Sequence, residues 1–276
     1  MISKGQDCII GKNVVIEGNV TLGHNVTIGD DVSIGDGTYI DSNTIIRNKV
    51  SIGKNSVVGA NCIIGEHLMD FCLDRQQHNH PVDISDNAII RSGTVIYGDV
   101  HVGTNFQTGH NVTIRENTVA GDNVSIGTNS DVQGNCSIGS YVRIHSRVFI
   151  APDTVIENCV WIFPGVILTN DPTPPSEHML GITVKSYAVI AAGAVLLPGI
   201  IVNSDSLVSA GAVVTRNVDR YQVVAGNPAK VISDIRTVKN KVTGELAYPW
   251  RYHFKKYMPW QESDFSSWYA SLNLGD

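Results

Sequence analysis

The sequence lacks the features that mark several large classes of protein. None of its apolar runs approaches the roughly 20 residues that cross a bilayer, and the N-terminal segment MISKGQDCIIG has no apolar core of a signal peptide. Charged residues make up only 17% of the 276 residues. The net charge of −6 and a pI near 5.8 argue against nucleic acid or an anionic membrane as the main partner, although they leave room for a local phosphate site. We therefore expect a cytoplasmic protein.

Cysteine is scarce as well. The chain has five cysteines, an odd number without a CxxC pair, so neither a disulfide framework nor a zinc knot is indicated. We expect reduced thiols, with Cys8, Cys62 and Cys136 at inward positions of the repeat described next.

The sequence is instead dominated by one short repeat. From Cys8 to His67 it reads CIIGKN VVIEGN VTLGHN VTIGDD VSIGDG TYIDSN TIIRNK VSIGKN SVVGAN CIIGEH. The third residue of each block is apolar, and the same phase runs from Ile84 to Leu168 and from Val184 to Val214. Of these 31 positions, 29 are Ile, Leu or Val, and the exceptions are Thr108 and Ala120.

The other positions of the repeat also have mechanical roles. A small or β-branched residue stands two places before the apolar one, Gly commonly follows it, and Asn or Asp comes two residues after that Gly. Small and branched side chains suit inward strand positions, whereas Gly, Asn and Asp tolerate the backbone of tight corners. A corner every six residues predicts a chain that coils into flat strands stacked in parallel.

This pattern resembles the hexapeptide-repeat family over residues 8 to about 232. The resemblance implies an all-β fold, a left-handed parallel β-helix with three hexads in each triangular coil. The 31 hexads then predict about ten coils and a prism about 50 Å tall, at roughly 4.8 Å between stacked strands. We expect the β-helix to occupy residues 1–232, with loop insertions at 68–83 and 169–182, and an aromatic-rich extension at 233–276.

The two insertions and the extension fall outside the repeat. The first loop carries Cys72, His78 and His80, but nothing near them completes a metal site, so we expect no metal and a loop that folds over a neighbouring subunit. The second loop, which contains TND and three prolines, contacts ligand or is purely structural. The extension holds nine of the nineteen aromatic residues, and we expect it to pack on the prism or a partner rather than stack on ligand.

The segment VVAGNPAKVI resembles the closing motif of acyl-CoA-dependent members of the family. The resemblance implies an acyl-CoA co-substrate whose pantetheine lies between two subunits, where Ala and Gly let it approach the backbone. The implied cofactor-binding residues, which could instead be plain corner or surface residues, are Ala192, Gly193, Ala210, Gly211, Arg216, Asn227, Pro228 and Lys230.

Residues 95–130, the ILTND turn and the GNPAK closure together also resemble N-acyltransferases of nucleotide-linked amino sugars, and PWRYHF resembles the subset acting on dTDP-3-amino-3,6-dideoxyhexoses. The resemblance implies a homotrimer that transfers an acetyl or 3-hydroxybutyryl group from acyl-CoA to a dTDP-linked amino-deoxy sugar, for O-antigen or other surface polysaccharide. A hydroxyl acceptor or an acyl carrier protein donor is an alternative. A metal-dependent hydrase or a non-catalytic scaffold fits the sequence less well.

The stretch HVGTNFQTGHNVTIREN, residues 101–117, contains the candidate catalytic groups. An imidazole titrates near neutral pH, so His110 is the candidate base, with Glu116 or Asp99 to orient it or bind the substrate ammonium. His110 and Glu116 stand in adjacent hexads, hence on different faces of one chain, and a trimer could bring them together. Candidate substrate-binding residues, for which solvated corners are the alternative, are Tyr97, Asn105, Gln107, Arg115, Asn170 and Asp171.

Two further expectations concern neighbours of this stretch. Phe106 stands where small residues are usual, and we expect it to fill the volume that Thr108 and Ala120 leave in the core. Among the other histidines, His101 is the nearer competitor of His110, and His145 directly follows an apolar position where Gly is usual.

Overall fold

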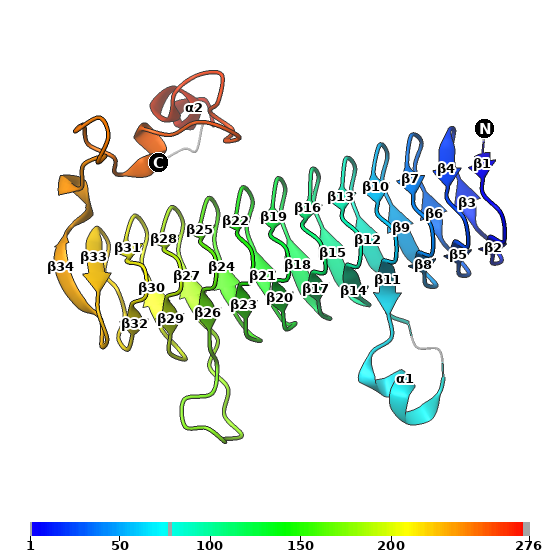
Figure 1. The fold of residues 1–276 in the computed structure, drawn as a ribbon, viewed down its shortest axis with the longest axis horizontal. Helices are drawn as coiled ribbons and strands as arrows, with labels where there is room; N and C mark the ends of the chain where they lie inside the picture. Colours follow the sequence, from blue (N-terminus) through cyan, green and yellow to red (C-terminus); the bar gives the residue numbers. More distant parts are fainter. Residues whose placement is uncertain (1, 77–78, 273–276) are drawn as a thin grey trace.

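Short strands follow one another along the chain and stack into three parallel sheets that form the sides of a prism (Figure 1). The computed structural model describes residues 2–76 and 79–272. Each strand pairs with the strand one coil away, so that Gln107 lies beside Ser125 and Arg143 beside Trp161. The fold is the predicted all-β, left-handed parallel β-helix.

The three sheets share one order of strands. Sheet A contains β1 (Ile2–Lys4), β4 (Val20–Leu22), β7 (Tyr39–Ile40), β10 (Val57–Val58), β13 (Ile89–Ile90), β16 (Gln107–Thr108), β19 (Ser125–Ile126), β22 (Arg143–Ile144), β25 (Trp161–Ile162), β28 (Val189–Ile190), β31 (Leu207–Val208), β33 (Gln222–Ala225) and β34 (Lys230–Asp234). Sheet B contains β2 (Ile9–Ile10), β5 (Thr27–Ile28), β8 (Ile45–Ile46), β11 (Ile63–Glu66), β14 (Val95–Tyr97), β17 (Thr113–Ile114), β20 (Asp131–Val132), β23 (Phe149–Ile150), β26 (Ile167–Leu168), β29 (Val195–Leu196) and β32 (Val213–Val214). Sheet C contains β3 (Val15–Ile16), β6 (Ser33–Ile34), β9 (Val50–Ile52), β12 (Val82–Ile84), β15 (Val100–Val102), β18 (Thr118–Ala120), β21 (Ser137–Ile138), β24 (Val155–Ile156), β27 (Thr183–Val184) and β30 (Ile201–Val202).

The β-helix has about 12 turns, more than the ten predicted. The difference arises at both ends of sheet A, where β1 pairs with β4 and β33 pairs with β31 although neither strand belongs to a regular hexad. Strand pairing therefore extends beyond the regular hexads at both ends, and counting hexads alone underestimates the number of turns.

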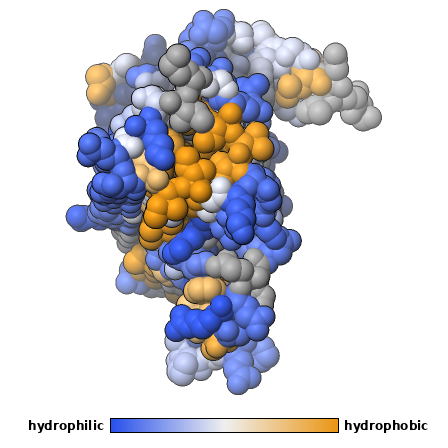
Figure 2. Space-filling model, turned by 90° about the vertical axis from the view of Figure 1, so that its right-hand side faces the viewer, coloured by the Kyte–Doolittle hydropathy of each residue, from blue (hydrophilic) through white to orange (hydrophobic). Residues whose placement is uncertain are grey.

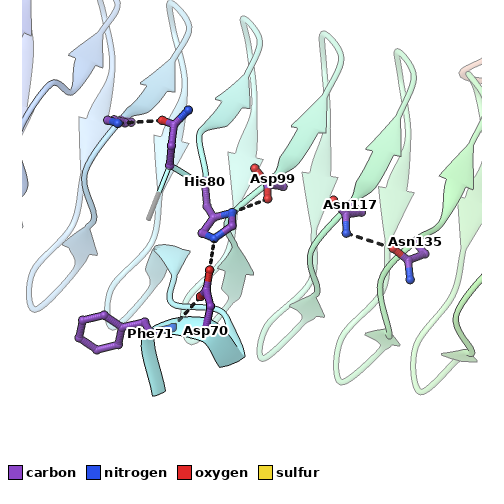
Figure 3. A network of polar contacts seen from close by, with 8 residues as sticks. Asp70, Phe71, His80, Asp99, Asn117 and Asn135 are labelled. Carbon is purple, nitrogen blue, oxygen red and sulfur yellow. Dashed lines mark hydrogen bonds and ion pairs between the residues drawn. The ribbon is translucent and has the colours of Figure 1, made fainter. Parts of the chain in front are cut away.

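The corners confirm the role predicted for Asn and Asp. Asn105, Asn111 and Asn117 have φ of 58°, 54° and 56°, in the left-handed region that these short polar residues tolerate. Asn side chains also link successive corners, since Asn117 Nδ2 donates to Asn135 Oδ1 at 3.1 Å (Figure 3). Corner geometry is thus sufficient reason for most of the Asn residues in the repeat.

The interior is filled by the apolar position of each hexad. The inward residues of the turn that contains the two exceptions are Phe106, Thr108, Val112, Ile114, Thr118 and Ala120. Phe106 is fully buried, whereas Thr108 and Ala120 are 3% and 5% exposed, so this turn is closed despite its smaller side chains. At the N-terminal end Ile9 and Val15 are exposed, and the view onto this end shows an apolar area (Figure 2).

We name the edges of the prism by the sheets that they join. The AB edge is the row of corners that the chain makes after the strands of sheet A. The BC edge is the row of corners after the strands of sheet B, and the CA edge is the row after the strands of sheet C. Both insertions leave the prism at the BC edge, after β11 and after β26, and the first includes α1 (Met69–Asp74) (Figure 1). Among residues 2–76 and 79–272 no helix is both long and apolar enough to cross a membrane.

The C-terminal tail folds back on sheet A, as expected from its aromatic residues. It contains η1 (Ile235–Thr237), η2 (Trp250–Tyr252) and α2 (Phe265–Ser271), which lie beside the C-terminal coils (Figure 1). Trp250, Met258, Trp260 and Phe265 form a second apolar cluster with Cys159 and Val189 of the β-helix. The tail is held by this cluster, which is separate from the prism interior.

Candidate functional site

The AB edge carries the candidate base and four candidate cofactor residues in one line. His110 stands at the corner after β16, Ala192 and Gly193 after β28, and Ala210 and Gly211 after β31. Four strand spacings separate the corners of His110 and Ala192, about 19 Å at roughly 4.8 Å each. All five residues are exposed, so an extended ligand could touch each of them from outside the prism.

In the C-terminal coils, the AB edge exposes backbone that no side chain covers at two glycines. Gly193 and Gly211 have φ of 69° and 68°, and a Cβ added to either would meet nothing within 4 Å. Glycine is favoured at both positions because the backbone there is left-handed, and not because a side chain would clash with the rest of the chain. The open space beside them is the kind of surface that a thin acyl-CoA chain could approach.

Two candidate phosphate ligands meet at the C-terminal end of the prism. Arg216 and Lys230 line a common hollow of about 240 Å³ with residues of β33 and β34. Asn227 and Pro228 lie in the exposed turn between these two strands. Two cations in one open hollow suit a phosphate group.

A hollow of about 680 Å³ lies on the outer face of sheet A beside the AB edge. Gln107, Arg143 and Trp161 project into it from β16, β22 and β25, and Tyr257 of the tail closes one side. His145 lines the side next to the AB edge. We call this the sheet A hollow. Amide, guanidinium and imidazole groups beside aromatic rings can bind both a sugar and a flat base.

The sheet A hollow contains residues that sequence reasoning missed. Arg143 Nη2 donates to the carbonyl of Tyr257 at 3.2 Å, which ties the tail to the hollow. His145 stacks on Phe163 at 4.7 Å between ring centroids, and burial lowers its pKa, so the imidazole is neutral at pH 7. The available signal was that His145 replaces the usual corner Gly. Tyr257, in contrast, reaches the hollow only through the folding of the tail.

A different cluster occupies the BC edge. Asp99 Oδ2 lies 2.6 Å from Nδ1 of His80, and Asp70 Oδ2 of α1 lies 2.6 Å from Nε2 of the same imidazole (Figure 3). Gly98 packs against this loop, since an added Cβ would lie 2.5 Å from His80 Cβ. Asp99 thus fastens the first loop to the prism and, within one chain, does not orient His110.

Three more candidates lie on the same edge: Tyr97 at the end of β14, and Arg115 and Glu116 at the corner after β17. Arg115 Nη2 donates to Glu116 Oε1 at 2.7 Å, and its guanidinium lies 5.6 Å from the ring centroid of Tyr97. Further along the edge, Asp171 accepts hydrogen bonds from Thr173 and Ser176 inside its own loop. The hydrogen bonds from Ser176 outweigh burial and lower the pKa of Asp171, which keeps it ionised. Glu116 and Asp171 therefore already have partners within the chain.

The predicted site residues are consequently divided among three edges. His110 lies on the AB edge, with its amide donating to Thr128 Oγ1 and no hydrogen bond to its imidazole from the described residues. Asn105 lies on the CA edge and donates to Asn123 at 3.1 Å. The BC edge holds Tyr97, Asp99, Arg115, Glu116, Asn170 and Asp171. One chain alone does not bring these groups together. This agrees with the prediction that His110 and Glu116, which stand in adjacent hexads, lie on different faces of the chain.

The first loop offers no metal site in the part of the chain that the structure describes, where no three or more His, Cys, Asp and Glu side chains are arranged to hold an ion. Cys72 is exposed, and His78 lies outside the described residues.

The His80 contacts predict a pH-dependent loop. Burial lowers the pKa of His80, but the hydrogen bonds to Asp70 and Asp99 outweigh it and the net pKa is raised. The stabilisation is complete below the ordinary histidine pKa of about 6.5 and is lost as pH rises through the raised value. We expect His80→Gln to accelerate trypsin cleavage at Arg75 relative to the wild type at pH 6, with the ratio approaching one at higher pH.

His101→Gln is the matched control for that experiment. Its imidazole makes one exposed contact, to Asp83 at 2.9 Å, and such pairs contribute little. A ratio for His80→Gln that stays constant with pH would contradict the predicted protonation of His80.

Comparison with known proteins supports the repeat assignment. Residues 7–42 and 31–66 match the family described as bacterial transferase hexapeptide (six repeats). Over 85 residues the chain is 34% identical to 2,3,4,5-tetrahydropyridine-2,6-dicarboxylate N-acetyltransferase of Staphylococcus aureus strain JH9, a match that covers 30% of this chain and 35% of the relative. The chain thus matches about a third of the length of that curated relative.

Two solved structures are similar to this chain. UDP-N-acetylglucosamine O-acyltransferase of Moraxella catarrhalis RH4 is 22% identical with a TM-score of 0.49, covering 83% of this chain and 73% of that one. The acetyltransferase domain of PglB from Neisseria gonorrhoeae FA1090, solved with acetyl coenzyme A, is 22% identical with a TM-score of 0.35, covering 55% and 58%. In its six-residue period the chain is similar to the bacterial transferase hexapeptide family over residues 7–66, and its fold is the left-handed β-helix that this period predicts.

Proposed function

We propose that the protein transfers a short acyl group, acetyl or 3-hydroxybutyryl, from acyl-CoA to the amino group of a dTDP-linked amino-deoxy sugar. The observation that carries the proposal is the line on the AB edge. It joins His110 to the bare backbone at Gly193 and Gly211, beside the sheet A hollow. The matching S. aureus relative, named as an N-acetyltransferase, supports an amine as the acceptor.

The hollow suits the nucleotide sugar. Trp161 and Tyr257 offer aromatic faces to a base, Arg143 offers a guanidinium to the pyrophosphate, and Gln107 can hydrogen-bond sugar hydroxyls. The hollow reaches the AB edge at Gly109, next to the candidate base. A sugar bound there would present its amine to a thioester lying along the edge.

The reaction then requires one base. His110 accepts a proton from the amine as the amine nitrogen attacks the thioester carbonyl, and the tetrahedral intermediate collapses with cleavage of the C–S bond. The proton passes to the departing sulfur, so the products are the amide and free CoA thiol. His145, which lies two coils further along the same edge and is neutral at pH 7, is the second candidate for this role.

We propose that a homotrimer completes the cleft. The outer face of sheet B is largely apolar and half-buried to exposed along its length, with Ile45, Ile63, Val95, Phe149, Ile167, Val195 and Val213. If a threefold axis faces sheet B, the AB edge of each chain meets the BC edge of the next. His110 would then face the neighbour's Asp99, Arg115 and Glu116, which one chain keeps apart.

If sheet B forms the trimer interface, a charge placed on its apolar outer face should disrupt the trimer. We expect Ile167→Glu, which places a charge on a residue that is 40% exposed on sheet B, to convert trimer to monomer in light scattering. Val155→Glu is the matched control, because Val155 has the same exposure but lies on sheet C. Dissociation by Val155→Glu instead would move the interface to sheet C.

The hollow between Arg216 and Lys230 predicts where the phosphates of CoA bind. We expect Lys230→Ala to weaken acyl-CoA binding about tenfold, the effect of losing one charge-assisted hydrogen bond, and to leave nucleotide sugar binding unchanged. Lys12→Ala, at an exposed lysine near the other end of the prism, is the control. Unchanged CoA affinity in Lys230→Ala would remove Lys230 from the site.

The proposed activity is tested by a thiol-release screen. Purified protein is mixed with acetyl-CoA or 3-hydroxybutyryl-CoA and with dTDP- or UDP-linked 3-amino and 4-amino sugars, and free CoA thiol is measured. We expect release that depends on a dTDP-linked amino sugar. Release that requires a hydroxyl acceptor, or transfer only from acyl carrier protein, would replace the proposal with another acyltransferase.

A further inference from the structure

A second hollow of about 470 Å³ lies on the CA edge, between the last coils and the tail. The β-helix contributes Lys185 and Tyr187 from the corner after β27 and Asp205 from the corner after β30. The tail contributes Arg251 of η2 and Phe265 of α2. We call it the CA hollow. It shares no lining residue with the sheet A hollow or with the hollow around Lys230.

A buried ion pair forms the floor of the CA hollow. Asp205 is 2% exposed and pairs with Arg251, which is 7% exposed. The guanidinium of Arg251 lies 4.6 Å from the ring centroid of Tyr187 and 5.1 Å from that of Phe265. Its Nε is buried and has no hydrogen-bond partner among the described residues. The pair therefore anchors the tail while one donor of Arg251 stays unsatisfied.

The CA hollow has more positive than negative charge. Arg220 also contacts Asp205, at 3.1 Å, and its side chain remains 56% exposed. Lys185 has no carboxylate partner in the described part of the chain. Burial raises the pKa of Tyr187 to about 12, so its hydroxyl adds no negative charge. Three cations facing one carboxylate leave a net charge of +2 at neutral pH.

Aromatic rings surround these cations. Tyr252 and Tyr269 line the hollow and are 53% and 51% exposed. Arg251 lies over one side of the Tyr252 ring and Phe265 stacks on one side of the Tyr269 ring, so each ring has its other side for stacking. A volume of about 470 Å³ falls in the range of small-molecule sites, roughly 300–1,000 Å³. Guanidinium groups match phosphate oxygens in a fork geometry, and exposed rings match a nucleobase.

We propose that the CA hollow is a second ligand site, which binds a nucleoside diphosphate through Lys185 and Arg220, with the base against Tyr252 or Tyr269. The site is separate from the cleft of the proposed reaction. Its walls come from both the tail and the β-helix, so the bound nucleotide holds the two parts together and stabilises the folded tail.

Calorimetry on the full chain tests this site without acyl-CoA. The variant Lys185→Ala/Arg220→Ala removes the half-buried Lys185 and the exposed Arg220 and leaves the buried Arg251–Asp205 pair intact. We expect it to weaken dTDP or ADP binding at this site about 30-fold or more, by the loss of two charge-assisted contacts. Lys12→Ala/Lys241→Ala, with the same change in charge at exposed sites, should bind as the wild type does.

Gln107→Ala, in the sheet A hollow and outside the aromatic cluster of the tail, separates this site from the proposed substrate site. We expect ADP binding that Gln107→Ala leaves in place and Lys185→Ala/Arg220→Ala weakens, and this result is independent of whether the protein acylates a sugar. Nucleotide binding that only Gln107→Ala weakens, or none in the wild type, would overturn the proposal. Inorganic pyrophosphate bound as tightly as dTDP would overturn the role of the aromatic rings.

Discussion

Replacing His110 with alanine is expected to lower kcat with the acceptor sugar by about 10² to 10³, the usual contribution of a positioned general base. The effect should fall on kcat rather than on the KM for either substrate, because the imidazole acts on the proton that leaves during attack. Initial rates of CoA thiol release, with both substrates varied, measure the two constants separately.

The chain contains a matched control for His110. His24 occupies the same corner position in an identical Gly-His-Asn tripeptide, four strand spacings nearer the N-terminus on the same AB edge. His24→Ala should therefore leave turnover unchanged. A wild-type rate in His110→Ala together with a large loss in His145→Ala would transfer the role of base to His145, which lines the sheet A hollow.

Replacing Phe106 with alanine is expected to lower the free energy of unfolding by about 3–5 kcal/mol, the usual cost of truncating a buried phenylalanine. Phe106 is fully buried in the turn where Thr108 and Ala120 replace larger side chains, so little else can fill the cavity. Denaturant unfolding of the wild type and variant measures the change, provided that both transitions are two-state.

Two further variants test whether Phe106 compensates for its neighbours. Val119→Ala removes an exposed side chain from the same turn and should cost less than about 0.5 kcal/mol. Phe106→Ala/Ala120→Ile restores part of the missing volume and should recover some of the stability lost in the single variant. Equal losses in Phe106→Ala and Val119→Ala would show that Phe106 does not fill the core.

Coil stacking explains which site residues could be found in advance. Because one turn takes 18 residues, Gln107, Ser125, Arg143 and Trp161 form one outward ladder, and their alignment follows from counting along the sequence. Counting also placed His110 and Glu116 on different faces. The same arithmetic would have marked His145, had its replacement of a corner Gly been given more weight.

Contacts made by the loops and the tail could not be found in this way. His80 and Asp99 meet because the first loop returns to the prism after an excursion whose path no period specifies. Tyr257 reaches Arg143 across 114 positions of sequence, and Arg251 reaches Asp205 across 46, only after the tail has folded on its aromatic cluster.

The sequence by itself determined the β-helix, its inward and outward residues, its corners and the places of both loops, because a six-residue period repeats one local choice of backbone in every strand. The pairing of Asp99 with His80, the pairing of Glu116 with Arg115 and the contribution of the tail to two hollows follow from tertiary contacts that no period specifies. The physical reason is that stacked strands obey a fixed spacing, whereas loops and tails settle where apolar burial and ion pairing across distant segments are most favourable.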